Sequence, residues 1–73
     1  MEDEIYTSDT HVARVHIMEV SHGVYVGYVY LRRASEEPHM ESPFQVEGEY
    51  SRRDLAMDAA RALAAKLLKE YEF

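Results

Sequence analysis

The amino-acid sequence predicts an α+β domain: a three-stranded antiparallel β-meander with one C-terminal α-helix packed on one face of the sheet, in the order β-β-β-α. Two neighbouring segments, 11–20 and 24–33, are rich in β-branched and aromatic residues and are separated by the turn-forming letters SHG. A third segment, 43–50, alternates apolar and polar residues, and 51–72 has the periodicity of an amphipathic helix. With 73 residues, the chain has room for one domain with a small core.

The first ten residues, MEDEIYTSDT, are expected to form a flexible acidic tail, which leaves residues 11–73 as the domain. Four of the ten are acidic and contribute −4 to the net charge of −6 of the chain. No periodic pattern indicates where Ile5 and Tyr6 would dock, and chain ends without such a pattern are commonly poorly ordered.

The pairing register of the first two strands follows from their side-chain pattern. We expect Ser21, His22 and Gly23 to form a three-residue loop, a type I turn closed by a glycine at positive φ. A two-residue turn would move the pairing by one residue and mix core and surface residues on each face. With the three-residue loop, one face is small and aliphatic throughout, through the pairs Ala13–Leu31, Val15–Val29 and Ile17–Gly27. The other face pairs His16 with Tyr28 and Arg14 with Tyr30.

The third strand is expected to extend the buried face with Phe44, Val46 and Tyr50. Its remaining side chains alternate with these and join the opposite face: Gln45, Glu47 and Glu49. Gly48 lies inside this segment and indicates either a β-bulge or a place where the helix comes close to the sheet.

Residues 51–72 are predicted to form the helix. Ser51 fits the N-cap position, Asp54 would complete a capping box, and Tyr50 would pack on Leu55 as a hydrophobic staple. One stripe would then face the sheet, consisting of Ala56, Ala59, Ala60, Leu63, Leu67 and Tyr71. Because alanine is small, the helix axis can lie close to the strands.

A single helix covers only one face of a three-stranded sheet, so the other face is either solvated or bound to a partner. Tyr, Arg and Met, which are enriched where proteins meet, are frequent on that face, which also carries Val26. A solvated ladder of strand-forming tyrosines is the simpler alternative. The expected partner-binding residues are Arg14, His16, Met18, Tyr28, Tyr30, Arg32, Glu47 and Glu49.

From this face we predict a small acidic, non-enzymatic protein-binding or regulatory module, with homodimerisation as one form of binding. Phage-type inhibitors and accessory proteins have a comparable size and charge. Because the net charge of −6 attracts basic partners, an acidic mimic of nucleic acid that binds a basic protein is the third hypothesis, after nucleic-acid binding. Ordinary acidic surface that keeps the chain soluble is the simpler interpretation of the same charge.

The runner-up to the protein-binding module is nucleic-acid binding through Arg52 and Arg53 at the helix N-terminus, with bases stacking on the sheet tyrosines. The segment SRRDLAMDAARALAAKLLKEY resembles the C-terminal helix of a double-stranded RNA-binding domain, and this resemblance implies phosphate contacts at the same two arginines. The family's first helix and the loop motif between its first two strands have no counterpart here, and Met57 stands where a further lysine is expected. We interpret the resemblance as a shared helix composition, and the net charge makes nucleic acid the less favoured partner.

Catalytic and metal-binding patterns are missing from the sequence. The chain has no cysteine, and its four histidines are dispersed, with His11 and His16 on opposite faces of one strand and His22 and His39 in loops. Neither a glycine-rich phosphate loop nor a nucleophile with a positioned base is present. We therefore expect no enzymatic activity, no cofactor and no metal. No apolar run approaches the ~20 residues of a membrane helix, so we expect no membrane association and a cytoplasmic location.

Overall fold

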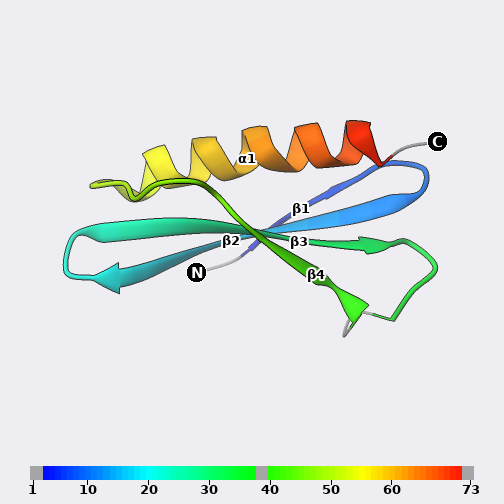
Figure 1. Ribbon diagram of the computed structural model, residues 1–73, viewed down its shortest axis with the longest axis horizontal. Helices are drawn as coiled ribbons and strands as arrows, with labels where there is room; N and C mark the ends of the chain where they lie inside the picture. The colour runs from blue at the N-terminus through cyan, green and yellow to red at the C-terminus, as the bar shows by residue number, and fades with distance from the viewer. Residues whose placement is uncertain (1–2, 38–39, 72–73) are drawn as a thin grey trace.

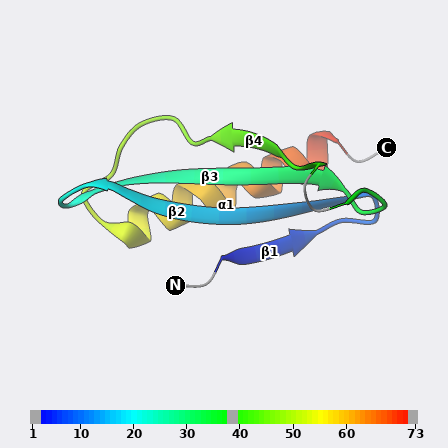
Figure 2. The same ribbon diagram turned by 90° about the horizontal axis from the view of Figure 1, so that it is seen from below.

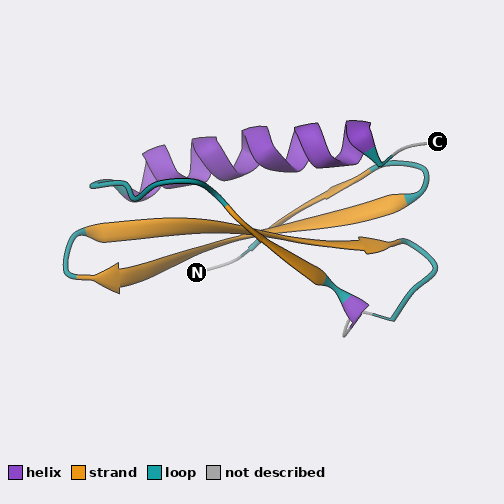
Figure 3. Cartoon of the chain, in the orientation of Figure 1, coloured by secondary structure: helices purple, strands orange, loops and turns teal. Residues whose placement is uncertain are grey.

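The computed structural model describes residues 3–37 and 40–71. Within these residues the chain forms an α+β fold, in which an open antiparallel sheet of four strands carries one C-terminal helix on one face (Figures 1 and 3). The strand order across the sheet is β1-β2-β3-β4, the same as the order along the chain. The elements are β1 (Glu4–Thr7), β2 (His11–Ser21), β3 (Val24–Arg33), β4 (Ser42–Gln45) and α1 (Arg53–Glu70).

The long β2–β3 hairpin has the predicted register. Val15 pairs with Val29, and the aliphatic pairs on either side of it, Ala13–Leu31 and Ile17–Gly27, are also as expected. Gly23 has the predicted positive φ, 73°. The predicted three-residue loop is wrong, because Ser21 belongs to β2 and pairs with Val24, so that only His22 and Gly23 connect the strands. The register shifts between Glu19 and Ser21, so one extra residue bulges next to this turn.

The N-terminal segment differs from the expected flexible tail, because residues 4–7 form strand β1. This strand pairs antiparallel with β2, with Ile5 opposite Arg14 and Glu4 opposite Val15. At the sheet edge, Glu4 also accepts hydrogen bonds of 2.7 and 2.8 Å from the Arg61 guanidinium of α1. The acidic segment is therefore an edge strand that connects the sheet to the helix.

The strand predicted over 43–50 is shorter in the structure and is followed by a bulge. After β4 ends at Gln45, the Val46 amide still donates to the Gly27 carbonyl, and Tyr50 forms two backbone hydrogen bonds with Tyr25. Three residues, 47–49, thus stand opposite one residue of β3. Gly48 has a φ of 90°, and no heavy atom lies within 4 Å of the place where its Cβ would be. Of the two expectations for Gly48, the bulge is correct and the close approach of the helix is wrong.

The helix starts two residues later than predicted. Arg52 occupies the N-cap position in an extended conformation, and no side chain caps the helix, so the predicted Ser51 cap and capping box are wrong. Because Tyr50 is still hydrogen-bonded to Tyr25, the preceding chain is held along the sheet and cannot turn into the helix at Ser51. Among the described residues, no helix has both the length and the apolar character needed to cross a membrane.

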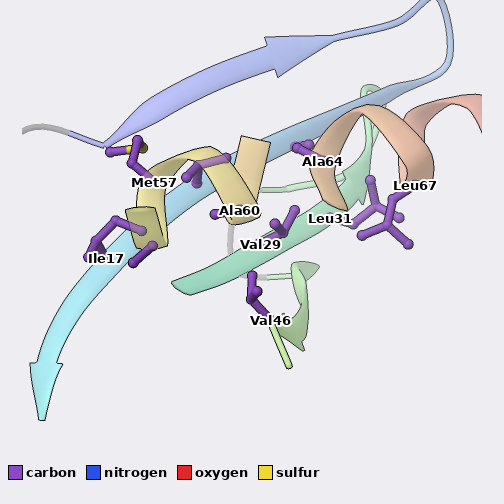
Figure 4. Packing of buried hydrophobic residues seen from close by; sticks show 11 residues of the cluster. Ile17, Val29, Leu31, Val46, Met57, Ala60, Ala64 and Leu67 are labelled. Atoms are coloured by element: carbon purple, nitrogen blue, oxygen red, sulfur yellow. The ribbon is translucent and has the colours of Figure 1, made fainter. Parts of the chain in front are cut away.

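The helix buries a stripe that is rotated from the predicted one. Its buried residues are Ala56, Met57, Ala60, Ala64 and Leu67. Leu63 and Ala59 are only partly buried, and Tyr71 is 40% exposed. These helix residues pack against the aliphatic face of β2 and β3, which supplies Ile17, Val29 and Leu31 (Figure 4).

Gly27 explains where the helix lies. A Cβ atom on this residue would be 3.1 Å from the Ala60 Cβ and the Val46 Cγ2, and 3.2 Å from the Ala56 carbonyl oxygen. The first turns of α1 therefore rest directly on the β3 backbone, which brings the line through Ala56, Ala60 and Ala64 onto the sheet.

Candidate binding surface on the open sheet face

The sheet has one face beneath α1 and one that the helix leaves uncovered (Figure 2). We call the uncovered side the open face. The strand pairing assigns to it every second residue of each strand, namely Ile5, Thr7, Val12, Arg14, His16, Met18, Val26, Tyr28, Tyr30, Arg32, Pro43 and Gln45. All six of the predicted binding residues that belong to strands lie on this face, so the pairing brings them together.

Two tyrosines form the centre of the open face. Tyr28 and Tyr30 lie on β3 with their ring centroids 6.3 Å apart and an interplanar angle of 25°. The guanidinium carbon of Arg14 lies 4.3 Å from the Tyr30 ring centroid, and the His16 ring centroid lies 6.5 Å from it. A cation over the ring face is attracted by its quadrupole, so Tyr30 is held between two neighbours from β2.

A cluster of ion pairs surrounds Arg14. Glu41, in the loop before β4, accepts two hydrogen bonds from the guanidinium, 3.1 Å from Nε and 2.8 Å from Nη2. Asp3 accepts a third from Nη1 at 2.5 Å, and its other oxygen lies 2.8 Å from His16 Nδ1. The side chains of Arg14, Asp3 and Glu41 keep only 32%, 27% and 16% of their exposure. Positive charge on this part of the face is thus already paired within the chain.

These contacts shift the pKa values of charged groups on and near the open face. Partial burial alone would raise the pKa of Asp3, but the hydrogen bonds from His16 and Arg14 outweigh it and lower the pKa. The two hydrogen bonds to Glu41 raise the pKa of Arg14. On the other side of β1, the hydrogen bonds from Arg61 and Tyr6 lower the pKa of Glu4 to about 2. Asp3, Arg14 and Glu4 are therefore charged at neutral pH.

Arg32 is also occupied by local contacts. Its Nη1 donates to the backbone carbonyls of Arg33, Ala34 and Glu36 at 3.2, 3.4 and 3.0 Å. The guanidinium therefore fixes the loop that follows β3. A partner could contact its edge, but its nearest acceptors belong to this chain.

Three expectations about the open face need correction. Val26 has the predicted orientation and pairs with Met18, but it is only 3% exposed and does not offer a contact surface. Glu47 and Glu49 are exposed but lie in the bulge after β4, outside the strands, because Gly48 turns the chain there. The alternation that assigned the two glutamates to the open face ends at Gln45.

The two arginines of the nucleic-acid hypothesis lie at the start of the helix. Arg52 is exposed and pairs with Asp54 at 2.7 Å, and Arg53 is the first residue of α1. The tyrosines of the open face lie on the side of the sheet opposite the helix. The structure therefore does not combine these arginines and tyrosines into one continuous surface.

The histidines lie apart in the described part of the chain, as their spacing predicted. His11 pairs with Arg33 on the helix side of the sheet and its ring lies 5.9 Å from that of Tyr71, whereas His16 lies on the open face. Residues 3–37 and 40–71 contain no group of three or more potential metal ligands of the His, Cys, Asp and Glu types. The prediction for His39 lies outside the described residues.

A shallow hollow of about 370 Å³ lies at the end of the sheet near the C-terminal end of α1. It is lined by Asp9, Thr10, His11, Arg33, Ala34, Ser35 and Tyr71. The His11 ring inside it is held by a 2.8 Å hydrogen bond between Nδ1 and the Thr10 hydroxyl. The residues that line this hollow do not include Tyr28 or Tyr30, so the hollow is separate from the centre of the open face.

Sequence reasoning missed two residues of this surface, Asp3 and Glu41. Both are carboxylates in segments that were interpreted as an acidic tail and a polar loop. They reach Arg14 across 11 and 27 residues of chain. The sequence offered one signal for these contacts. Arg14 lies in the middle of a strand without a carboxylate opposite it, and a partly buried arginine usually has an acidic partner.

Comparisons of the chain with protein-family models, curated proteins and solved structures give no match.

Proposed function

We propose that this protein is a small protein-binding module that acts through the open face. The observation that carries the proposal is the stacked pair Tyr28–Tyr30 at the centre of a sheet face that no element of the described chain covers. Tyrosine, arginine and methionine are the residue types that most often provide binding energy at protein interfaces, and they do so near the middle of the contact. Met18 lies beside the pair and is 43% exposed.

The open face is prepared for binding by its internal contacts. Arg14 and His16 hold Tyr30 from β2, and Glu41 and Asp3 hold Arg14 in turn. A side chain that is already fixed loses little conformational freedom when a partner arrives, so less of the interaction energy is lost on binding. The ion pairs therefore support the aromatic surface without themselves being the contact.

Because its charges are paired internally, we expect the open face to bind mainly through rings and apolar side chains. Such binding changes little with ionic strength, whereas binding to a phosphate backbone weakens steeply as salt rises. Salt dependence therefore separates the proposal from the nucleic-acid hypothesis.

The experiment compares partner capture by the wild-type chain and by the double variant Tyr28→Ser/Tyr30→Ser. Capture should be lost in the double variant, while far-UV circular dichroism shows that the helix and sheet remain. Leu55→Ser is the matched control, because Leu55 is 42% exposed on the helix and distant from the open face. Capture that survives the double variant and is lost in Leu55→Ser would contradict the proposal.

Filter binding to single- and double-stranded nucleic acid at low salt completes the test. We expect no binding that depends on Arg52 or Arg53. Micromolar, salt-sensitive binding that disappears in Arg52→Ala/Arg53→Ala would replace the proposed function with the nucleic-acid hypothesis.

A further inference from the structure

We infer that the partner of the open face is a second copy of this chain, so that two sheets pack face to face across a two-fold axis. This inference rests on the proposed function and specifies the partner. The arrangement would be a symmetric sandwich with the two helices outside and the two sheets inside. A two-fold contact uses the same patch on both subunits, so that patch must be complementary to itself.

The charge distribution points to a second copy. The four strands place only two charged side chains with permanent charge on the open face, Arg14 and Arg32. Arg14 is neutralised by Asp3 and Glu41, and Arg32 is bonded to loop carbonyls. Arg14 and Arg32 together balance Asp3 and Glu41, so the net charge of −6 resides on the rest of the chain.

This balance argues against a partner that is recognised by a strong positive or negative charge. A basic protein would find the carboxylates of the open face already paired. An acidic protein would find Arg14 paired with carboxylates and Arg32 bonded to loop carbonyls. Two copies of a chain of charge −6 repel each other at most orientations, but least where the face is locally neutral. The open face, where two arginines balance two carboxylates, is therefore the face that we infer to meet its own copy.

A stable face-to-face dimer sets the area that the open face has to bury. A standard interface buries about 800 Å² on each partner, which is about a sixth of the 4970 Å² surface of this chain. The open face runs along the 38 Å length of the molecule (Figure 2). Two twisted sheets pack well in this way, with their strands about 30° apart and their inner side chains interdigitated.

The arrangement of side chains on the open face also fits a two-fold contact. Tyr28 and Tyr30 belong to β3, and Arg14 and His16 to β2, which are the two inner strands of the sheet. The rings thus lie at the middle of the patch, where residues that dominate binding energy are found. Met18 and Ile5, which are 43% and 62% exposed, lie farther out and would be covered by the partner sheet.

Sedimentation equilibrium from micromolar to millimolar concentration tests this inference on the full chain. We expect a reversible monomer–dimer equilibrium. The double variant Tyr28→Ser/Tyr30→Ser should raise the dissociation constant at least about tenfold, because each substitution removes a central contact twice in a symmetric interface. Met18→Glu is the second variant. Its side chain is exposed, so folding is not at risk, and it places a like charge on both copies.

Leu55→Ser should leave the dissociation constant unchanged, because Leu55 lies on the helix, away from the open face. A chain that stays monomeric at millimolar concentration overturns the inference, as does a dimer that persists in both open-face variants. If the monomeric chain still captures a foreign protein through Tyr28 and Tyr30, the inference fails and the proposed function stands. If it is monomeric and captures nothing, both fail.

Discussion

The two faces of the sheet are built from alternate residues of the same strands, yet they are stabilised by different means. Beneath α1, small side chains let the helix rest on the sheet, with Gly27 in contact with Ala56 and Ala60. On the open face, Tyr30 and Arg14 are held by each other and by acids from distant segments. The face beneath the helix depends on the small size of its side chains, and the open face depends on polar contacts between segments that are far apart in the sequence. The comparison indicates that packing beneath the helix sets the fold, whereas polar contacts between distant segments hold the side chains of the open face.

The largest effect is expected for a leucine beneath the helix. Leu67 is 5% exposed, whereas Leu63 one turn earlier is only partly buried. Leu67→Ala should lower the free energy of unfolding by about 2–4 kcal/mol, and Leu63→Ala by about 1 kcal/mol. The loss of stability increases with the volume of buried side chain that the substitution removes. Urea denaturation measures both. Equal losses, or a larger loss at Leu63, would show that the helix stripe is the one predicted from the sequence.

A methyl group at position 27 tests the close approach of the helix. Gly27→Ala places a Cβ at 3.1 Å from two side-chain carbons, so the helix or Val46 must shift. We expect a loss of about 1–3 kcal/mol, the range for overpacked cores. Thermal unfolding provides the measurement, and Ala65→Ser on the exposed side of α1 should change stability by less than about 0.5 kcal/mol. A stabilised Gly27→Ala protein would rule out this packing.

Removing an arginine from either side of the sheet compares the two polar clusters. Arg14→Ala leaves the partly buried Asp3 and Glu41 without their partner, and we expect a loss of about 1–2 kcal/mol. Arg61→Ala removes a more exposed pair with Glu4 and should cost less stability than Arg14→Ala, because solvent screens an exposed ion pair. Chemical denaturation of the two variants under identical conditions gives the comparison. The reverse order would mean that the open face is not supported by Arg14.

The smallest effect is expected from pH. The folded-state pKa of Glu4 is about 2, below its ordinary value of 4.5, and that of Asp3 is also lowered. A lowered folded-state pKa means that the stabilisation is present above the ordinary value and is lost as the pH falls from about 4.5 towards 2. The urea midpoint should therefore decrease over this interval, and less so in Glu4→Gln. An unchanged midpoint in the wild type would show that β1 does not depend on these ion pairs.

The sequence specified the hairpin and the face assignment because both follow from local alternation. Val15 and Val29 lie directly opposite each other only in this register, a shift by one residue would move them to opposite faces, and Gly23 has the positive φ expected of it. The six strand residues that were predicted to bind a partner lie on one face for the same reason, and their role in binding stays a prediction. A one-residue slip would have exposed the aliphatic set, which makes such patterns informative.

The remaining features depend on contacts that local patterns do not contain. Strand β1 is short and exposed, and its stabilising partners, Arg14 and Arg61, lie far along the chain. The helix start was displaced because Tyr50 is hydrogen-bonded to Tyr25, which outweighs the local preference for a cap at Ser51. Tertiary contacts here override sequence propensities of about 1 kcal/mol.

The most direct test of the binding role of the open face is a dilution series followed by backbone and side-chain NMR chemical shifts. Binding through the open face to a second copy predicts concentration-dependent shifts at Met18, Tyr28 and Tyr30, with the outer side of α1 unchanged. Shifts confined to Leu55 and its neighbours on the helix, or none up to millimolar concentration, would contradict that account.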